Sequence, residues 1–328
     1  MTDFQAPEKP PRDDVSATPV VIVTGPTASG KSGLALELAG RFDGTVINAD
    51  SMQVYRDLRV LSARPDAAEE ARAPHRLFGV LGAEERCSVG RWLDMAAAEI
   101  AAARAARRLP LVVGGTGMYL KALTQGLAPV PDVPEAVTAD ATALYDDLGG
   151  EAFRARLADR DRGAAAALPP GDRQRLIRAY AVAAATGRTL AAWQSEAPPG
   201  APVAARFFTV LVLPPRADLY AACDARFTAM LEAGAVDEVR SLLARGLDPS
   251  LPAMRAVGVP ELGAAIRGEM TLDQAADKAR QATRNYAKRQ LTWFRHQLSP
   301  DLTIDRGGAD AVSDLSMKLK KFVAVRDV

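Results

Sequence analysis

The sequence predicts an α/β fold in which helices flank a parallel sheet and an all-helical insertion interrupts the core. Three observations lead to this prediction. Short β-branched runs recur between helical stretches, the first run leads through a glycine-rich turn into a helix, and residues 129–200 lack a strand pattern. Apolar runs of this kind fit strands that are buried on both faces, as parallel strands are.

The first predicted strand, residues 20–23, leads into the sequence GPTASGKS and then into a leucine-rich helix. G-x-x-x-x-G-K-S between a strand and a helix is typical of a phosphate-binding loop, whose glycines let successive N–H groups face an anion. Lys31 adds a positive charge, and the Ser32 hydroxyl is a ligand for Mg²⁺. We therefore expect a protein that handles a di- or triphosphate. The predicted diphosphate- or nucleotide-binding residues are Gly25, Pro26, Thr27, Ala28, Ser29, Gly30, Lys31 and Ser32.

A second predicted strand begins at Gly44 and ends at Asp50. Ligands of open parallel sheets gather beyond the carboxyl ends of the strands, so Asp50 is expected to face the same crevice as the phosphate-binding loop. That position suits a general base or a metal ligand. A helix cap or a turn residue is the alternative that residue preferences allow.

The third predicted strand begins at Leu109 and ends in Gly114-Gly115-Thr116. ATP-hydrolysing enzymes with such a loop place an aspartate at this kind of strand end to help hold Mg²⁺. Glycines and a threonine at a helix start offer backbone donors and a hydroxyl instead, although a simple capped helix explains them equally well.

Composition shifts divide the chain. Residues 1–18 are rich in Pro, Asp, Glu and Lys, and we expect a disordered tail there. Proline-rich stretches at both ends of residues 129–200 indicate hinges around a helical insertion. Residues 19–128 and 201–300 then form one discontinuous core, and residues 301–328 a C-terminal tail with a short strand and a weak helix.

Strand character returns at residues 206–213, and a long helix is predicted over residues 272–298. Arg284 and Lys288 share a face of this helix, with Tyr286 and Trp293 interleaved, a pattern that can follow nucleic acid. Aromatic residues at helical spacing are more often core. In the insertion, arginines one helical turn apart at 175 and 178 could grip phosphates or form a solvated face.

The whole-chain properties exclude several classes of protein. The 328 residues carry a net charge of +1, and 48% are hydrophobic, which is ordinary for a globular protein that is not grossly basic. Cys87 and Cys223 lie far apart, so neither a disulfide framework nor a zinc site is indicated, which fits a reducing cytoplasm. No run is long enough to span a membrane, and nothing indicates an obligate oligomer, so we expect a cytoplasmic monomer.

Five stretches together resemble the tRNA dimethylallyltransferases, also called tRNA isopentenyltransferases of the IPP transferase family. They occur in the family's order and cover about residues 20–298. The stretches are GPTASGKS at 25–32, NADSMQVY at 48–55, VGGTGMYL at 113–120, QRLIR at 174–178 and ATRNYAKRQLTWFR at 282–295.

The resemblance implies a P-loop NTPase-like core and transfer of a dimethylallyl group from its diphosphate to N6 of the adenosine 3′ to the anticodon of tRNA. Asp50 would be the base, Thr116 would lie between adenine and diphosphate, and Arg226 would hold the leaving diphosphate with Mg²⁺ on Ser32. The implied tRNA-binding residues are Asp50, Ser51, Met52, Gln53, Thr116, Thr138, Gln174, Arg175, Leu176, Ile177 and Arg178, with Arg284 and Lys288 from the long helix.

Two alternatives use the same residues. A small-molecule kinase would bind ATP in the loop and use Asp50 as the base for a hydroxyl. A non-catalytic RNA-binding adaptor would have a degenerate loop, but Lys31, Ser32 and Asp50 are intact. Consumption of ATP without allyl transfer would distinguish the kinase.

Overall fold

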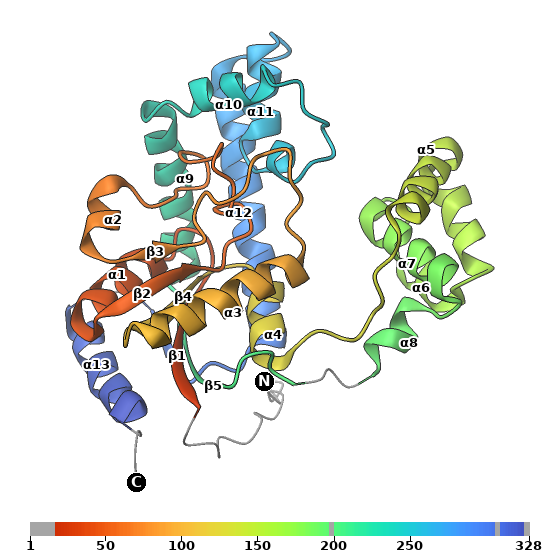
Figure 1. Cartoon of the computed structure of the whole chain (residues 1–328). Coiled ribbons are helices and arrows are strands. Elements are labelled where there is room, and N and C mark those ends of the chain that lie inside the picture. The colour runs from red at the N-terminus through yellow and green to blue at the C-terminus, as the bar shows by residue number, and fades with distance from the viewer. Residues whose placement is uncertain (1–16, 197–199, 306–308, 325–328) are drawn as a thin grey trace. The chain divides into compact units, whose positions relative to one another are not determined.

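A computed structural model describes residues 17–196, 200–305 and 309–324 (Figure 1). Six strands in these ranges form one sheet in the order β3-β2-β4-β1-β5-β6, and every neighbouring pair is parallel. The parallel α/β core is therefore confirmed. The strands are β1 (Thr18–Thr24), β2 (Gly44–Asn48), β3 (His75–Arg76), β4 (Leu109–Gly114), β5 (Ala205–Val212) and β6 (Leu302–Ile304).

The helices follow the pattern expected from the sequence, and those of the described residues include none long and apolar enough to cross a membrane. In the core they are α1 (Lys31–Phe42), α2 (Ala67–Arg72), α3 (Val89–Ala105), α4 (Gly117–Gln125), α9 (Arg216–Glu232), α10 (Ala235–Leu243), α11 (Val259–Ile266), α12 (Leu272–Gln297) and α13 (Ala309–Ala324). In the insertion they are α5 (Glu135–Ala158), α6 (Arg162–Ala167), α7 (Arg173–Thr186) and α8 (Leu190–Gln194).

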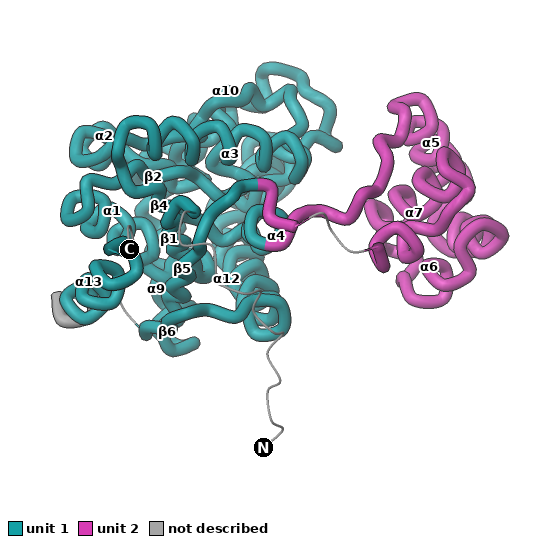
Figure 2. Tube along the Cα trace, turned by 60° about the horizontal axis from the view of Figure 1, so that its bottom comes forward, with its two compact units in different colours: residues 1–124, 203–328 teal, residues 125–202 magenta. Residues whose placement is uncertain are grey.

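Two compact units make up the chain (Figure 2). The first contains residues 1–124 and 203–328, and the second contains residues 125–202. The second unit is slightly wider than the predicted 129–200, because the prolines that marked the hinges lie within the connecting segments and not at their ends. Its described residues form helices and no strand.

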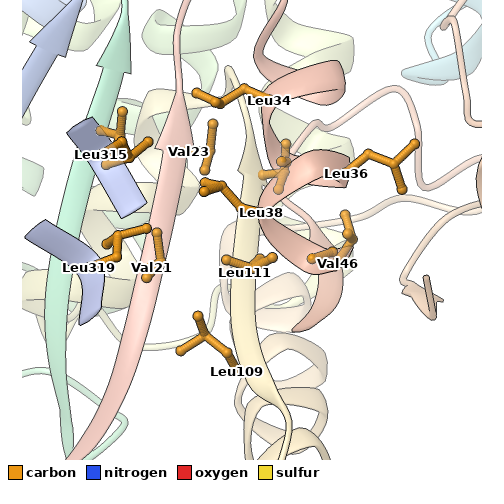
Figure 3. Close-up of a cluster of buried hydrophobic side chains, with 14 of the residues drawn as sticks. Val21, Val23, Leu34, Leu36, Leu38, Val46, Leu109, Leu111, Leu315 and Leu319 are labelled. Carbon is orange, nitrogen blue, oxygen red and sulfur yellow. The ribbon is translucent and has the colours of Figure 1, made fainter. Parts of the chain in front are cut away.

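One face of the sheet packs against α1 and α13 (Figure 3). Val21 and Val23 of β1 and Leu111 of β4 are buried against leucines of α1. Residues alternate between the two faces of a strand, so Val20 and Ile22 point to the other side. On that side α3 contacts β2 and β4, so these strands are covered on both faces.

The short strand and the final helix predicted after residue 300 are both present as β6 and α13, but they belong to the core and not to a tail. β6 pairs with β5 in the sheet, and Leu315 and Leu319 of α13 are completely buried in the main core (Figure 3). At the other end, β1 already begins at Thr18, so the predicted tail of residues 1–18 is too long. The rest of that predicted tail, residues 1–16, lies outside the described residues.

The second unit has a small core of its own. Phe153 and Leu157 of α5 are buried with Leu176 of α7, and Tyr180 packs beside Phe153. Within α5, Gly149 has a φ of 73°, a left-handed conformation that a glycine adopts without strain, and the helix kinks there. The second unit therefore has a hydrophobic core that is separate from the core of the first unit.

Candidate active site

The carboxyl ends of β1, β2 and β4 lie at one edge of the sheet, since all three strands are parallel neighbours. β1 continues into the phosphate-binding loop, β2 into Asp50, and β4 into Gly115 and Thr116. The loops are also tied to each other, because the Thr116 N–H donates to the carbonyl of Ala49, 3.2 Å away. Three segments that are far apart in sequence therefore form one site.

The phosphate-binding loop has the tight backbone that its glycines allow. A Cβ at Gly25 would lie 2.4 Å from the carbonyl oxygen of Val212, so only glycine fits between β1 and β5. Lys31 is buried, and its Nζ donates to the carbonyl of Pro26 at 3.2 Å. Burial lowers the pKa of Lys31 to about 8, although the Asp50 carboxylate opposes that shift. A buried, partly compensated ammonium is well placed to receive an anion.

Asp50 is held by its neighbours in a fixed orientation. Its Oδ1 accepts a hydrogen bond from the Met52 N–H at 2.9 Å, which is the turn that the residue preferences allowed. Its own N–H donates to Oδ1 of Asn48 at 2.8 Å, and Trp92 donates to the Asn48 carbonyl at 2.8 Å. The carboxylate also lines the same cavity as Lys31. The turn therefore presents Asp50 to the site, and the two interpretations of this residue are compatible.

Two adjoining cavities meet at Asp50. One, of about 430 Å³, lies over the phosphate-binding loop and is lined by residues 27–32. The other is a cleft of about 240 Å³ with Met52, Phe227 and Met230 in its wall. Four residues line both cavities and so mark the junction between them: Thr27, Asp50, Ser62 and Arg226.

Arg226 lies at this junction, where the resemblance placed it. It is carried by α9, and its Nη2 donates to Oγ1 of Thr27 at 2.7 Å. Burial lowers the pKa of the guanidinium, and the Asp50 carboxylate opposes the shift. One hydrogen bond thus fixes a cation directly against the phosphate-binding loop.

Gln290 of α12 joins two parts of the site, and sequence reasoning missed it. Its Oε1 accepts from the Thr27 N–H at 2.8 Å, and its Nε2 donates to the Gly115 carbonyl at 2.9 Å. The side chain is buried. The signal was present, since Gln290 lies inside the last of the five motifs, but its partners are more than 170 positions away in the sequence.

The cleft also contains charged and aromatic residues, of which Tyr286 belongs to the pattern predicted for the long helix and Arg255 was not predicted. Arg255 and Arg289 line it, together with Tyr286. Burial and the Asp50 carboxylate raise the pKa of Tyr286, so its hydroxyl stays protonated and can donate a hydrogen bond. Arg289 lies over the Tyr286 ring, 5.6 Å from its centroid. The cations in the cleft wall therefore include Arg255 and Arg289, whereas Arg284 and Lys288 do not line the cleft.

The two residues of α12 that were predicted to contact RNA do not line the cleft. The Arg284 guanidinium donates to Asp224 and to Oε1 of Gln281, and its contact with RNA stays a prediction. Lys288 is exposed and also lies outside the cleft lining, so its contact with RNA stays a prediction.

Ser51, Met52 and Gln53 follow Asp50 but do not share one environment. Ser51 and Met52 line the cleft, and the Ser51 N–H donates to Oγ1 of Thr116 at 2.9 Å. Gln53 lines the phosphate cavity instead. Its Nε2 donates to the carbonyls of Ser62 and Ala63, so the amide nitrogen is already engaged and a two-point pairing with an adenine edge would need these bonds to break.

The motif in the insertion divides between surface and core. Gln174, Arg175 and Arg178 are exposed on α7, and Thr138 is exposed on α5. The side chains of Leu176 and Ile177 are buried in the core of the second unit, so any contact of these two residues with RNA would use their backbone and stays a prediction. A helix must bury one face, and these two apolar residues form part of that face.

A metal would have few protein ligands here. Ser32 is exposed and lines the phosphate cavity with Asp66 and Glu69. Among the described residues no three His, Cys, Asp or Glu side chains are grouped to hold an ion by themselves. A cation in this cavity would therefore have to take most of its ligands from a bound phosphate and from water.

Two family models match the chain: "IPP transferase" over residues 53–297 and "Isopentenyl transferase" over residues 18–79. The first spans more than half of the sequence. The chain belongs to the IPP transferase family. This confirms the resemblance that the five motifs indicated.

Relatives support the family assignment. A tRNA dimethylallyltransferase of Rhodospirillum centenum is 60% identical over 88% of this chain and 92% of its own length. One from Rhodospirillum rubrum is 54% identical over 91% of each chain. A crystal structure of a tRNA isopentenylpyrophosphate transferase from Bacillus halodurans has a TM-score of 0.66 and 30% identity, and covers 93% of this chain and 97% of the other.

A crystal structure described as a eukaryotic dimethylallyltransferase acting on tRNA has a TM-score of 0.79, with 95% of this chain and 81% of the other covered. Its identity is 22%, and the likeness is therefore one of fold. All of these structures are similar to this IPP transferase family member along nearly its whole length.

Proposed function

We propose that this protein transfers a dimethylallyl group from dimethylallyl diphosphate to N6 of the adenosine next to the 3′ side of the anticodon, position 37 of tRNA. The products are N6-isopentenyladenosine and diphosphate. Family membership and relatives named tRNA dimethylallyltransferase support the reaction. The observation that carries the proposal is the pair of adjoining cavities that meet at Asp50 and Arg226.

The phosphate cavity suits the donor. Backbone N–H groups of the loop, the Lys31 ammonium and the Arg226 guanidinium supply positive charge where the leaving diphosphate gains negative charge. The cleft on the other side of the junction has apolar and aromatic walls, which suit an isoprenyl chain and a base. The reacting carbon would then lie near Asp50.

The chemistry balances with the residues of this chain. The C1–O bond of the donor breaks and its electron pair leaves with the diphosphate, while the adenine N6 forms the new bond to C1. The N6 proton passes to the Asp50 carboxylate, which is oriented for this by the Met52 N–H. Thr116 holds the Ser51 backbone, so it supports the acceptor side of the cleft as a positioning residue.

Mg²⁺ is proposed as the cofactor, with Ser32 as its protein ligand beside the donor phosphates. The ion would neutralise phosphate charge and so make the diphosphate a better leaving group. The protein would contribute the Ser32 hydroxyl, and Asp66 and Glu69 line the same cavity.

The RNA must be held by a larger surface than the cleft. We propose that Gln174, Arg175, Arg178 and Thr138 of the second unit contact tRNA, since all four are exposed. Because the target base has to leave its stack to reach an enclosed cleft, contacts outside the cleft would hold the rest of the RNA. We further propose a monomer that acts in the cytoplasm.

The test combines purified protein, Mg²⁺, labelled dimethylallyl diphosphate and a tRNA with adenosines at positions 36 and 37. The expected result is label in the RNA and N6-isopentenyladenosine in its digest, identified by mass spectrometry. A tRNA with guanosine at position 37 is the matched control and should stay unlabelled. Consumption of ATP with no allyl transfer would contradict the proposal and favour a kinase.

A further inference from the structure

The wall of the reaction cleft includes a loop that a distant carboxylate holds in place. We define this wall loop as residues 58–63. Leu61 and Ser62 line the cleft, and Ser62 is one of the four residues at the junction of the two cavities. The other three junction residues are fixed by the site's own hydrogen bonds. The position of Ser62 depends instead on the contacts that hold the wall loop.

Glu238 of α10 holds this loop through its backbone. Oε2 of Glu238 accepts from the N–H groups of Arg59 at 2.7 Å and Val60 at 2.8 Å, and Oε1 accepts from the Leu61 N–H at 2.9 Å. Hydrogen bonds to an ionised acceptor are stronger than neutral ones. Three consecutive amides on one carboxylate fix both the position and the orientation of the loop backbone.

The opposite side of the wall loop is held as well. Gln53 Nε2 donates to the carbonyls of Ser62 at 3.0 Å and Ala63 at 2.8 Å. The Leu61 side chain fits tightly against Gly258, where an added Cβ would lie 2.7 Å from Leu61 Cδ2. The loop is therefore clamped between α10 and the segment that follows Asp50.

We infer that Glu238 is a positioning residue for the transfer reaction, acting through the wall loop on the shape of the cleft. It lies outside both cavity linings and touches no reacting group. Its effect comes from keeping Leu61 and Ser62 in place in the cleft wall, which also includes Asp50. The inference rests on the proposed function for its kinetic consequence, whereas its structural part can be measured without substrate.

The test compares Glu238→Ala and Glu238→Gln with Asp237→Ala as the matched control. Asp237 is the adjacent residue of α10, but its carboxylate is exposed and engages Arg240. Glu238→Gln keeps a carbonyl oxygen that can still accept from two of the three amides. Its effects on hydrogen exchange and on kcat/KM should therefore lie between those of the unsubstituted protein and those of Glu238→Ala.

Hydrogen exchange of the full-length protein should show the amides of residues 59–61 exchanging about tenfold faster, or more, in Glu238→Ala. Exchange in the phosphate-binding loop should not change. Unchanged exchange of residues 59–61 would overturn the inference, whatever reaction the protein catalyses.

With rates normalised to folded protein, kcat/KM for tRNA should fall about tenfold to a hundredfold in Glu238→Ala, with a raised KM for tRNA. A loss of folded protein alone would not raise KM. If residues 59–61 lose protection but kcat/KM equals that of Asp237→Ala, the wall loop has no positioning role. Absence of transfer by the unsubstituted protein would instead contradict the proposed function and leave the exchange result standing.

Discussion

The cations of the two units are held in opposite ways. In the first unit, Lys31 and Arg226 are desolvated and bonded to the phosphate-binding loop, and burial lowers the pKa of both. In the second unit, Arg175 and Arg178 are exposed on α7, and Arg175 has only a loose pairing with Asp172 at 3.7 Å. Desolvated, hydrogen-bonded cations are typical of a site that holds an anion of fixed shape, whereas exposed, loosely paired arginines are what the proposed contact with a long polyanion requires.

The largest effect should come from breaking the fixed arrangement. Arg226→Ala removes a desolvated cation at the junction, and we expect kcat/KM to fall about a hundredfold to a thousandfold in steady-state assays. Arg216→Ala, on the exposed part of the same helix, should change kcat/KM by less than about threefold. Equal losses in both variants would show that position at the junction does not matter.

A second way to break the fixed arrangement is to cut the link between its loops. Gln290→Ala leaves the buried Thr27 N–H and Gly115 carbonyl without partners, so the free energy of unfolding should fall by about 1–3 kcal/mol. Urea denaturation measures this value. Gln290→Glu retains the acceptor for the Thr27 N–H, so its free energy of unfolding should fall by less. If neither variant changes the free energy of unfolding, Gln290 does not link the two loops.

The buried state of Lys31 can be tested through pH. Its pKa of about 8 in the free protein must rise when an anion binds, because the anion favours the charged form. Affinity for inorganic diphosphate in EDTA should therefore weaken as pH rises above 8, by up to about tenfold per pH unit. The arginine of Lys31→Arg stays charged over this pH range, so its affinity for diphosphate should not show this loss above pH 8.

Calorimetric titrations of both proteins between pH 7 and pH 9.5 make the comparison. Titration of diphosphate itself is common to both, so the ratio of their Kd values isolates Lys31. A ratio that stays constant across this range would mean that the ammonium is not desolvated in the free protein.

The smallest effects should come from the exposed cations of the second unit. Arg175→Ala with Arg178→Ala should weaken tRNA binding and reduce the slope of log K against log salt by about 1.5–2. Filter binding at several salt concentrations measures the slope. Leu176→Met keeps the buried volume and should leave the slope unchanged; a changed slope there would indicate that the Leu176 side chain contacts RNA.

The sequence was informative where chemistry and local geometry coincide. Asp50 could be predicted because it ends a strand next to the phosphate-binding loop, and parallel strands bring such ends together. The motif that contains Leu176 and Ile177 was taken as a whole, whereas the period of α7 buries the side chains of these two residues. Separating the faces of that helix would have predicted their burial.

Other parts of the site depend on contacts between distant segments. Glu238 and Gln290 act on backbone groups more than 170 positions away, and one sequence contains no record of those pairings. α13 had an apolar spacing in Val312, Leu315 and Leu319, but its partner surface on the sheet could not be known before the fold. The apolar spacing alone therefore predicted a weak helix and did not show that α13 is buried in the core.

The central claim is that Asp50 accepts the proton at the junction of the two cavities. Single-turnover transfer with enzyme in excess tests it in Asp50→Asn, which keeps the size of the side chain and removes its basicity. The rate constant should fall about a hundredfold to ten-thousandfold, with tRNA and donor affinities within a few-fold of the unsubstituted protein. Transfer at an unchanged rate would contradict the account.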